Sequence, residues 1–495
     1  MMEPSKKQKH IEFAKSVIIV VLFLSAILLL YGFWWNAEPG QINLENIGNQ
    51  NGTFQSLSPQ EVIAPAVIEI SYGDGRFGVV DNDTLKYWWN PEGNSFTEIM
   101  VDFFATGNIF VESITKEQYR EVLLSESIKV TFDYDIPFKD ACKLYGILQP
   151  SGMGNISNLS EVAYSYGSME SLFICDRKEN QFYRIVGDES FSKTNDFNAI
   201  YEALDQESYV AYPLYQLLGE GTENPVLVPL PSEFAYTIST YKNERIVGEP
   251  EFERTLAQTF FGETFDFTRV IEDAKGGITY MYGYGERVFV AESDGSFRYK
   301  REGGNKKKLS QMEGLEISLD FIASHGGTKN SSGEIENIRL LKVKKEEGKG
   351  SKITFYFQIQ KDEALLYEEG APFIVECTGD IVTSFYRDLS IVDKTQKQNL
   401  SAGEYTAANV LAKNFEMMAN TLQSQGVIEY NNNEAFQAVG DAIKGIRLVE
   451  TRFRKTGEGV GKMETCWDFS FRKNGKTVDF YYSIKDALPM GYSVR

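Results

Sequence analysis

Two stretches decide how the second half of this chain is interpreted: "IRLLKVKK" at residues 338–345 and "IRLVETRFRK" at residues 446–455. They begin with the same three letters, 108 residues apart. Each follows a helix-like segment, "SQMEGLEISLDFIASHGG" or "NEAFQAVGDAIK", and each precedes a glycine-containing loop. Each loop leads into an aromatic strand, "KITFYFQIQ" or "METCWDFSFRK". The shared order of helix, strand, loop and aromatic strand predicts a duplicated α+β unit.

The repeated unit also carries the signals of helices packed on antiparallel sheets. Ser310 and Glu313, three residues apart, have the spacing of a capping box at the start of the first helix. Apolar side chains alternate along both aromatic strands, at Ile353, Phe355, Phe357 and Ile359 and again at Trp467, Phe469 and Phe471. Such alternation buries one face of a strand and leaves the other polar. Between the copies, residues 402–423 are predicted as a helix capped by Ser401 and Glu404.

Upstream segments predict further structure of the same class. Thr115 and Gln118 form a capping box before "KEQYREVLL". Val130, Phe132 and Tyr134 then alternate along the strand "IKVTFDYDIPF". The segment "ERVFVAESDGSFRYK" is a predicted hairpin with Asp-Gly at its turn. The fold class is therefore expected to be α+β with antiparallel sheets.

One long apolar run, "VIIVVLFLSAILLLYGFWW" at residues 17–35, predicts a transmembrane helix. As a helix it would span about 28 Å, close to the ~30 Å hydrocarbon core of a bilayer. A cleavable signal peptide has a shorter apolar core and a small-residue cleavage site, whereas this run ends in aromatic residues. A signal peptide with an unusual cleavage site is the alternative. Lysines precede the run and Glu38 follows it, so the N-terminus is expected in the cytoplasm and the rest outside.

These features divide the chain into segments. The prediction is a cytoplasmic tail at 1–16, a transmembrane anchor at 17–35, a polar tether at 37–58, and three extracytoplasmic α+β domains at 59–225, 226–395 and 396–495. The last two domains are expected to share one duplicated fold. The net charge is −20. An acidic surface of this size argues against binding nucleic acid or an anionic lipid surface by charge alone, and it is also typical of simple solubility.

The cysteines leave two alternatives open. Cys142, Cys175, Cys377 and Cys466 form no C-x-x-C pair, so neither a zinc ribbon nor a thioredoxin-type motif is present. Two disulfides are possible, with the pairs nearest in sequence as the local choice, and four buried free thiols are the alternative.

The sequence contains few groups suited to catalysis. It has two histidines, and His10 lies on the predicted cytoplasmic side. His325 falls at a predicted helix end, where a cation would favour the helix dipole. Motifs that need two histidines on the same side are thereby excluded, and G-x-S-x-G is absent. We expect neither a metal nor a cofactor.

Three local motifs have a structural explanation that competes with a functional one. "TGEGVGKM", at residues 456–463, resembles a P-loop but has Met463 after the lysine and precedes a strand, so a hairpin loop is expected. "DNDT" at residues 81–84 lacks the later ligands of a calcium loop and is expected to be a turn. Trp88, Trp89 and Glu92 could form a sugar platform, although such tryptophans more often pack in a core.

Several of these segments together resemble the YycH family of accessory regulators of the cell-wall sensor kinase WalK, also called YycG, of Gram-positive bacteria. The resemblance rests on the basic N-terminus, the single anchor, the acidic α+β domains and two local matches, "ITKEQYREVLLSESIKVTFDYDIPF" and "GGITYMYGYGERVFVAESDGSFRYKRE". "ITFYFQIQ" and "METCWDFSFRKNGKTVDFYYSI" are similar to strands of the companion protein YycI. Residues 150–225 match no pattern of the family.

The resemblance implies a non-enzymatic function: binding the kinase at the membrane and restraining its activity, together with a YycI-type protein. It also implies that the anchor contacts the kinase helices. The candidate anchor and contact residues are Val17, Ser25, Ala26, Leu29, Gly32, Trp34 and Trp35. Small residues allow transmembrane helices to approach closely. The alternative for Ser25 and Gly32 is that they only dilute the hydrophobicity of the helix.

Two other function classes remain open from the sequence. One is a membrane-bound cell-wall hydrolase that uses a pair of carboxylates, because the chain has 70 acidic residues and accidental pairs are certain to occur. The other is a receptor that binds wall fragments between its domains. Neither alternative requires nucleic acid or a cofactor.

Overall fold

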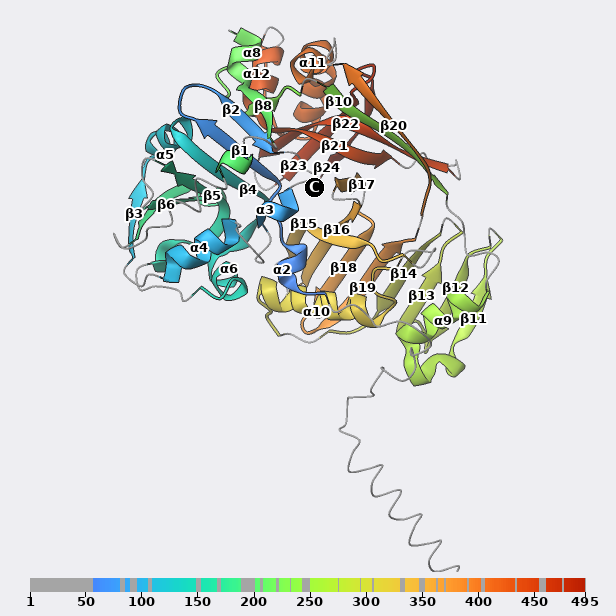
Figure 1. The fold of residues 1–495 in the computed structure, drawn as a ribbon. Helices are drawn as coiled ribbons and strands as arrows, with labels where there is room; N and C mark the ends of the chain where they lie inside the picture. Colours follow the sequence, from blue (N-terminus) through green and yellow to red (C-terminus); the bar gives the residue numbers. More distant parts are fainter. Residues whose placement is uncertain are drawn as a thin grey trace, which may run out of the picture. The chain divides into compact units, whose positions relative to one another are not determined.

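The structure is a computed structural model, and Figure 1 shows its fold. It describes residues 57–80, 85–89, 96–105, 109–147, 153–166, 171–187, 201–204, 208–219, 222–231, 233–242, 250–274, 276–293, 295–304, 307–329, 334–346, 352–361, 364–368, 371–389, 391–401, 406–431, 434–453, 460–473 and 476–494. Residues 55–495 belong to one compact unit. Helices and antiparallel sheets make up this unit, in agreement with the predicted fold class.

The first sheet contains nine strands in the order β3-β7-β6-β5-β4-β1-β2-β8-β9, all antiparallel. Its strands are β1 (Val67–Tyr72), β2 (Phe77–Val80), β3 (Phe110–Ile114), β4 (Glu126–Pro137), β5 (Asn158–Ser165), β6 (Ser171–Asp176), β7 (Gln181–Val186), β8 (Ser208–Pro213) and β9 (Leu227–Pro229). The accompanying helices are α2 (Pro59–Val62), α3 (Leu85–Trp89), α4 (Phe96–Ala105), α5 (Lys116–Leu124), α6 (Phe138–Leu144) and α8 (Leu214–Leu218).

Strand β4 shows why this sheet forms. Ile128, Val130, Phe132, Tyr134 and Ile136 are buried, and the residues between them are partly exposed. The predicted alternation is therefore confirmed, and each strand face has a different environment. Helix α5, just before β4, has the predicted capping box: the Thr115 side chain accepts from the Gln118 backbone and the Gln118 side chain accepts in return.

The second sheet has fifteen strands, twelve of which follow the order β11-β12-β13-β14-β19-β18-β16-β17-β21-β22-β10-β20, while β15 pairs with β16, β23 with β22 and β24 with β23. The strands are β10 (Glu233–Lys242), β11 (Arg269–Glu272), β12 (Ile278–Tyr282), β13 (Arg287–Ala291), β14 (Ser296–Arg301), β15 (Asn337–Glu346), β16 (Lys352–Lys361), β17 (Ala364–Glu368), β18 (Phe373–Thr378), β19 (Ile381–Asp388), β20 (Ile391–Ser401), β21 (Ile443–Phe453), β22 (Val460–Lys473), β23 (Lys476–Ser483) and β24 (Pro489–Val494). The helices are α9 (Pro250–Phe261), α10 (Gln311–Ser324), α11 (Ala407–Ser424) and α12 (Ala435–Ala442), and a 3₁₀ segment, η5, covers Gly262–Phe267.

The two predicted copies have the same order of elements. Helix α10 precedes β15, β16, β18 and β19, which lie side by side, and α12 precedes β21, β22, β23 and β24, which also lie side by side. The equivalent strand pairs have equivalent registers, with Leu340 opposite Phe357 and Leu448 opposite Trp467. The parallel pairing of β17 with β21 joins the two sets of strands into one sheet. Figure 1 shows α9 and α10 on one side of the β12–β19 strands.

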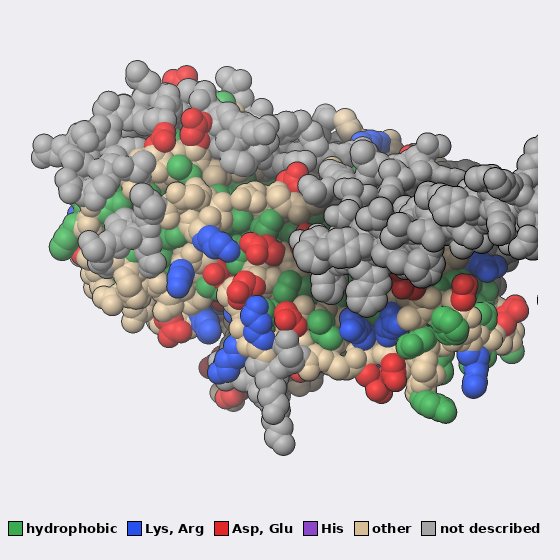
Figure 2. Space-filling model, turned by 90° about the horizontal axis from the view of Figure 1, so that it is seen from below, with side chains coloured by type: hydrophobic (Ala, Val, Ile, Leu, Met, Phe, Trp, Pro, Cys, Tyr) green, Lys and Arg blue, Asp and Glu red, His purple; other side chains and the backbone are tan. Residues whose placement is uncertain are grey.

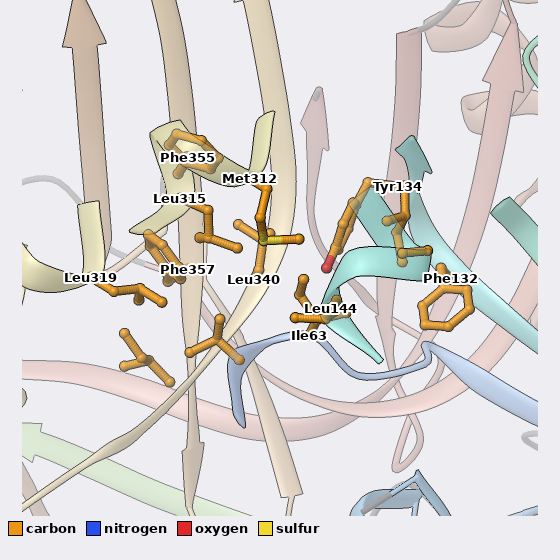
Figure 3. Close-up of a cluster of buried hydrophobic side chains, with 14 of the residues drawn as sticks. Ile63, Phe132, Tyr134, Leu144, Met312, Leu315, Leu319, Leu340, Phe355 and Phe357 are labelled. Atoms are coloured by element: carbon orange, nitrogen blue, oxygen red, sulfur yellow. The ribbon is translucent and has the colours of Figure 1, made fainter. Parts of the chain in front are cut away.

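Two large hydrophobic cores support these sheets. The first combines residues on both sides of the predicted boundary at 225/226: Ile63, Phe132, Tyr134 and Leu144 with Met312, Leu315, Leu319, Leu340, Phe355 and Phe357, as Figure 3 shows. The second core joins Leu214, Val228 and Tyr236 to the strands and helices after residue 406. The domain boundaries at 225/226 and 395/396 remain predictions.

One predicted helix start is wrong. Helix α11 begins at Ala407, where Thr406 is the N-cap and accepts from the backbone of Asn409. Ser401 is instead the last residue of β20, opposite Glu233 in β10. Pairing with β10 holds the Ser401 backbone in an extended ladder, so it is not available to start a helix, while Glu404 lies outside the described residues. The capping box predicted at Ser310 and Glu313 is confirmed at the start of α10.

Candidate interaction sites

The residues predicted to form the anchor lie outside the part of the chain that the structure describes. They are Val17, Ser25, Ala26, Leu29, Gly32, Trp34 and Trp35. Within the described residues, no helix is both long and apolar enough to cross a membrane. The anchor and its contacts are therefore still predictions from sequence.

His325 is a packing residue in this structure. It follows the last residue of α10, as predicted, and its ring stacks on Phe321 and lies against Phe260. Its Nδ1 atom is 2.8 Å from the Phe321 carbonyl oxygen. Burial lowers the pKa of His325 from its usual value to about 4, so the ring is neutral at neutral pH. The expected stabilisation of the helix dipole by a cation at this position is therefore wrong, because desolvation outweighs the dipole.

All four cysteines are free and buried. Of the two alternatives left open by the sequence, the structure has the free thiols. Burial raises the pKa of each thiol, to about 11 for Cys142 and Cys377. Protonated thiols in a core are poor nucleophiles and poor metal ligands. Among the described residues, no three His, Cys, Asp or Glu side chains are grouped so that they could hold a metal ion.

The tryptophan pair and the glycine motifs have structural roles where they are described. Trp89 is buried, donates from Nε1 to the Tyr145 hydroxyl at 3.0 Å, and makes an edge contact with Phe132. Trp89 therefore presents no platform to a sugar, Trp88 is partly buried against the same core, and Glu92 lies outside the described residues. Gly283 and Gly285 have positive φ values in the turn between β12 and β13, a conformation that favours glycine. The "DNDT" segment and most of the "TGEGVG" loop lie outside the described residues.

A buried charged network forms where β4 meets β15, β21 and β22. The Asp133 carboxylate on β4 accepts from Arg447 Nη1 at 3.0 Å and lies 3.8 Å from Arg339 Nη2. Arg447 also donates to Asp468 from Nε and Nη2, at 3.2 and 2.8 Å. Arg472 donates from Nη2 to the backbone carbonyl of Asp133 at 2.5 Å. We call this set of five residues the Asp133 junction.

The Asp133 junction explains the repeated "IRL". Arg339 is the arginine of the first copy and Arg447 that of the second, and both approach the two oxygens of the same carboxylate. Both arginine side chains are nine-tenths or more buried, as is Asp468, and Asp133 is 11% exposed. Buried charges are retained only when they are paired. One aspartate of the first sheet therefore fixes equivalent positions of both copies.

The repeat and the β4 strand are both predictable from the sequence, but the contact between them is not. The signal was present: Asp133 is an acidic residue on the half-buried face of an alternating strand, and the arginine recurs at the same position of both copies. Nothing in the sequence showed that these faces meet, because the contact joins residues 314 positions apart.

A second pair of buried charges lies between the copies. Arg452 on β21 is 3.3 Å from Asp388 on β19, and both side chains are 3% exposed. The neighbouring Arg387 donates to the carbonyl oxygens of Gly327 and Lys329, after α10, and lies over the Phe373 ring. Burial lowers the pKa of Arg387 to about 10, which still leaves it charged at neutral pH. The Arg452–Asp388 pair therefore connects the two copies, and Arg387 holds the loop after α10.

The described surface also has a group of exposed apolar side chains around β11. Phe267, Val270 and Ile271 are 77%, 56% and 46% exposed, and Tyr284 in the next turn is fully exposed. On the one face that Figure 2 shows, acidic, basic and hydrophobic side chains are interspersed. Exposed apolar side chains that lie close together mark interaction sites more often than isolated ones do.

No protein-family model and no curated protein sequence matches this chain. Its structure is similar to the crystal structure of YycH from Bacillus subtilis, with a TM-score of 0.52 and 12% identity, over 88% of this chain and 99% of that one. It is also aligned with an uncharacterized protein from Eubacterium rectale (TM-score 0.33, 10% identity, 55% of this chain and 92% of that one) and with the C-terminal domain of YpeB from Bacillus megaterium (TM-score 0.24, 9% identity, 50% and 96%). The first similarity shows a YycH-like fold.

Proposed function

We propose that this protein is a membrane-anchored, extracytoplasmic regulator that binds a cell-wall-sensing histidine kinase of the WalK type and restrains it. The observation that carries the proposal is the YycH-like fold, which extends over 88% of this chain and nearly all of the neighbour. A similarity of that extent covers the sheets and both copies of the repeat together. The family resemblance in sequence supplies the partner class that the fold alone does not.

The chemistry of the described residues supports a binding role over an enzymatic one. His325 is neutral and packed between aromatic rings, and the four thiols are buried. The carboxylates of the buried residues Asp133 and Asp468 form ion pairs with Arg447. A carboxylate pair for hydrolysis needs one group with a raised pKa next to a substrate cleft. The junction carboxylates instead serve to hold sheets together.

In this proposal, the anchor provides the contact with the kinase and the extracytoplasmic unit provides the contact with a YycI-type companion. A transmembrane contact regulates a kinase only if it binds the active and inactive states unequally. We therefore expect the anchor to favour the inactive arrangement of the kinase helices. Ser25 and Gly32 would form the close-packed face of that contact.

The test is co-reconstitution of the full chain with a full-length WalK-type kinase in proteoliposomes, with kinase autophosphorylation and co-purification as readouts. The unaltered chain should co-purify with the kinase and reduce autophosphorylation severalfold. Replacing both Ser25 and Gly32 with Leu should weaken both effects. The matched control replaces Ile27 and Leu30 with Ala, on the other side of the same helix.

Equal co-purification and equal inhibition by all three proteins would remove the anchor face from the mechanism. Absence of any effect of the unaltered chain on the kinase would overturn the proposed function itself. Release of soluble fragments from peptidoglycan by the purified chain would favour the hydrolase alternative.

A further inference from the structure

Strand β11 is the last strand at one end of the second sheet. It pairs with β12 through Arg269 opposite Met281 and Glu272 opposite Ile278, and no other described strand pairs with it. All four of its residues are exposed. An open edge of this kind presents unpaired backbone groups and is a template for another strand.

The backbone geometry determines which groups point out of the sheet. The Asp273 N–H donates to the Gly277 carbonyl at 2.9 Å, so the backbone N–H of Asp273 points towards the β12 side of the hairpin. Hydrogen-bonding direction alternates along an antiparallel strand. The backbone N–H and C=O groups of Arg269 and Ile271 therefore also point towards β12. Those of Val270 and Glu272 point outwards, away from β12.

This alternation restricts how the edge can pair with a copy of itself. In an antiparallel ladder, opposite residues are either both hydrogen-bonded or both not. A residue whose backbone groups point outwards must therefore lie opposite another outward-pointing residue, and an inward-pointing residue opposite another inward-pointing one. Placing Ile271 opposite Ile271 of a second copy satisfies this rule. Val270 then exchanges two hydrogen bonds with Glu272 of the other copy, and the symmetry doubles them to four.

The same register also matches charge and hydrophobicity. Arg269 lies opposite Asp273 of the second copy on both sides of the two-fold axis, and the two Ile271 side chains meet at that axis. A register shifted so that Val270 faces itself loses this match. It would also need the Thr268 N–H, which already donates to the Phe265 carbonyl at 2.9 Å.

We propose that the β11 edge is a self-association surface at which two copies of this chain pair antiparallel about Ile271, joining their sheets into one. The contact is isologous, since the same patch serves both copies. It involves few residues, so the dimer is weak in dilute solution. Two copies held in one membrane would meet at a much higher effective concentration. The inference stands apart from the kinase proposal, because it requires no second protein.

The experiment is disulfide trapping in the full chain in detergent. A non-hydrogen-bonded pair has Cα atoms about 4.5 Å apart, within the ~4.4–6.8 Å range of a disulfide. Ile271→Cys should therefore give a covalent dimer under mild oxidation. Glu272→Cys is the matched control: it is equally on the exposed strand, but its copies would lie roughly 8 Å apart, beyond the reach of a disulfide. The native cysteines are buried and should not interfere.

Two further variants, in the Ile271→Cys background, test the backbone and the charges. Val270→Pro removes only an outward N–H, which an edge strand tolerates, and should reduce cross-linking severalfold without altering the fold by circular dichroism. Arg269→Asp places like charges opposite each other and should also reduce it. Lys300→Asp, the same charge change three strands away in the ladder, should not.

Cross-linking of Ile271→Cys no stronger than that of Glu272→Cys would overturn the proposal. So would efficient cross-linking of Val270→Cys, because it would show the other register. Cross-linking unaffected by Val270→Pro would mean that the two chains meet without strand pairing, which also contradicts the proposal.

Discussion

At the scale of single residues, Asp133 links the first sheet to both copies of the repeat. Its carboxylate faces arginines from both copies of the repeat, and its backbone carbonyl accepts from a third arginine. Removing one partner of a buried ion pair lowers protein stability far more than removing one partner of an exposed ion pair, because the remaining buried charge is left without water or a counter-charge.

Asp133→Asn should lower the free energy of unfolding by about 3 kcal/mol, because Arg339 and Arg447 lose a buried counter-charge while Arg447 keeps Asp468. Urea unfolding followed by fluorescence would measure this. Asp135→Asn is the control on the same strand face: Asp135 is 27% exposed and 3.6 Å from Arg177, and should change stability by less than about 1 kcal/mol. Equal losses for both variants would contradict a special role for the junction.

His325 supplies a prediction about pH. Burial lowers its folded-state pKa from 6.5 to about 4, so between these values the unfolded chain binds more protons than the folded chain. Stability therefore falls as the pH is lowered through this window, by about 1–3 kcal/mol from this residue alone. His325→Phe keeps an aromatic ring and cannot titrate, so the difference in stability between the two proteins should change in favour of the variant from pH 7 to pH 4.5.

Proton NMR can check the His325 assignment directly. The chain has two histidines, His10 and His325, so two imidazole titrations are expected. One should remain neutral down to about pH 4, and it should be the one missing from His325→Phe. An ordinary titration midpoint near 6.5 for both rings would contradict the packing described for His325.

At the scale of elements, local signals predicted helix starts where the cap is made by neighbours in sequence. The capping boxes at Thr115 and Ser310 formed as predicted. The cap predicted at Ser401 did not form, because Ser401 lies in strand β20 and is paired there with Glu233 of β10, 168 positions earlier. A capping motif specifies a helix start only where the same backbone is not hydrogen-bonded in a strand with a distant segment.

Ser310→Ala should lower the free energy of unfolding by about 1 kcal/mol, because the first turn of α10 loses an acceptor for the Glu313 backbone N–H. Ser310→Asp is the matched variant: its carboxylate can accept the same hydrogen bond and favours the helix N-terminus, so stability should be retained. Thermal unfolding of the three proteins would measure the difference. A loss in the Asp variant as large as in the Ala variant would show that the hydroxyl is needed for another contact.

The strands of the two copies could be predicted because period-two alternation is a local property. Strand β11 could not: "RVIE" is four residues of mixed character, and its place at the end of the sheet depends on how β12 to β14 and β19 stack beyond it. The open edge of β11, and the register in which two copies of it could pair, can be inferred only from the pairing of β11 with β12. The candidate surface was therefore beyond sequence reasoning, although the adjoining hairpin was not.

At the scale of the whole described unit, one hydrophobic core contains residues from both sides of the predicted domain boundary at 225/226. Phe132 and Leu144 belong to the first sheet and its helices, and Leu340 and Phe355 to the second sheet, yet all four lie in one cluster (Figure 3). Because these side chains pack in one cluster, we expect the elements on both sides of this boundary to lose stability together. Sequence predicted the elements of each side but could not show that their apolar faces are shared.

Leu340→Ala tests this sharing. Leu340 is 1% exposed, so the change should cost about 2–5 kcal/mol and should raise hydrogen exchange in β4 as well as in β16. Leu422→Ala is the matched control in the second core, where Leu422 is fully buried. It should raise exchange in α11 and the C-terminal strands more than in β4. Confinement of the Leu340→Ala effect to the second sheet would contradict a common core.

The long sequence separation of the Asp133 junction has a consequence for biosynthesis. Arg447 follows Asp133 by 314 residues, and Arg472 follows it by 339. At about 5–20 residues per second, a ribosome needs roughly 15–60 s to cover the first of these intervals. Throughout that time β4 has been synthesised, whereas Arg447 and Arg472 have not. A product truncated before residue 447 cannot complete the Asp133 junction, so we expect such chains to be proteolysed more readily than finished ones.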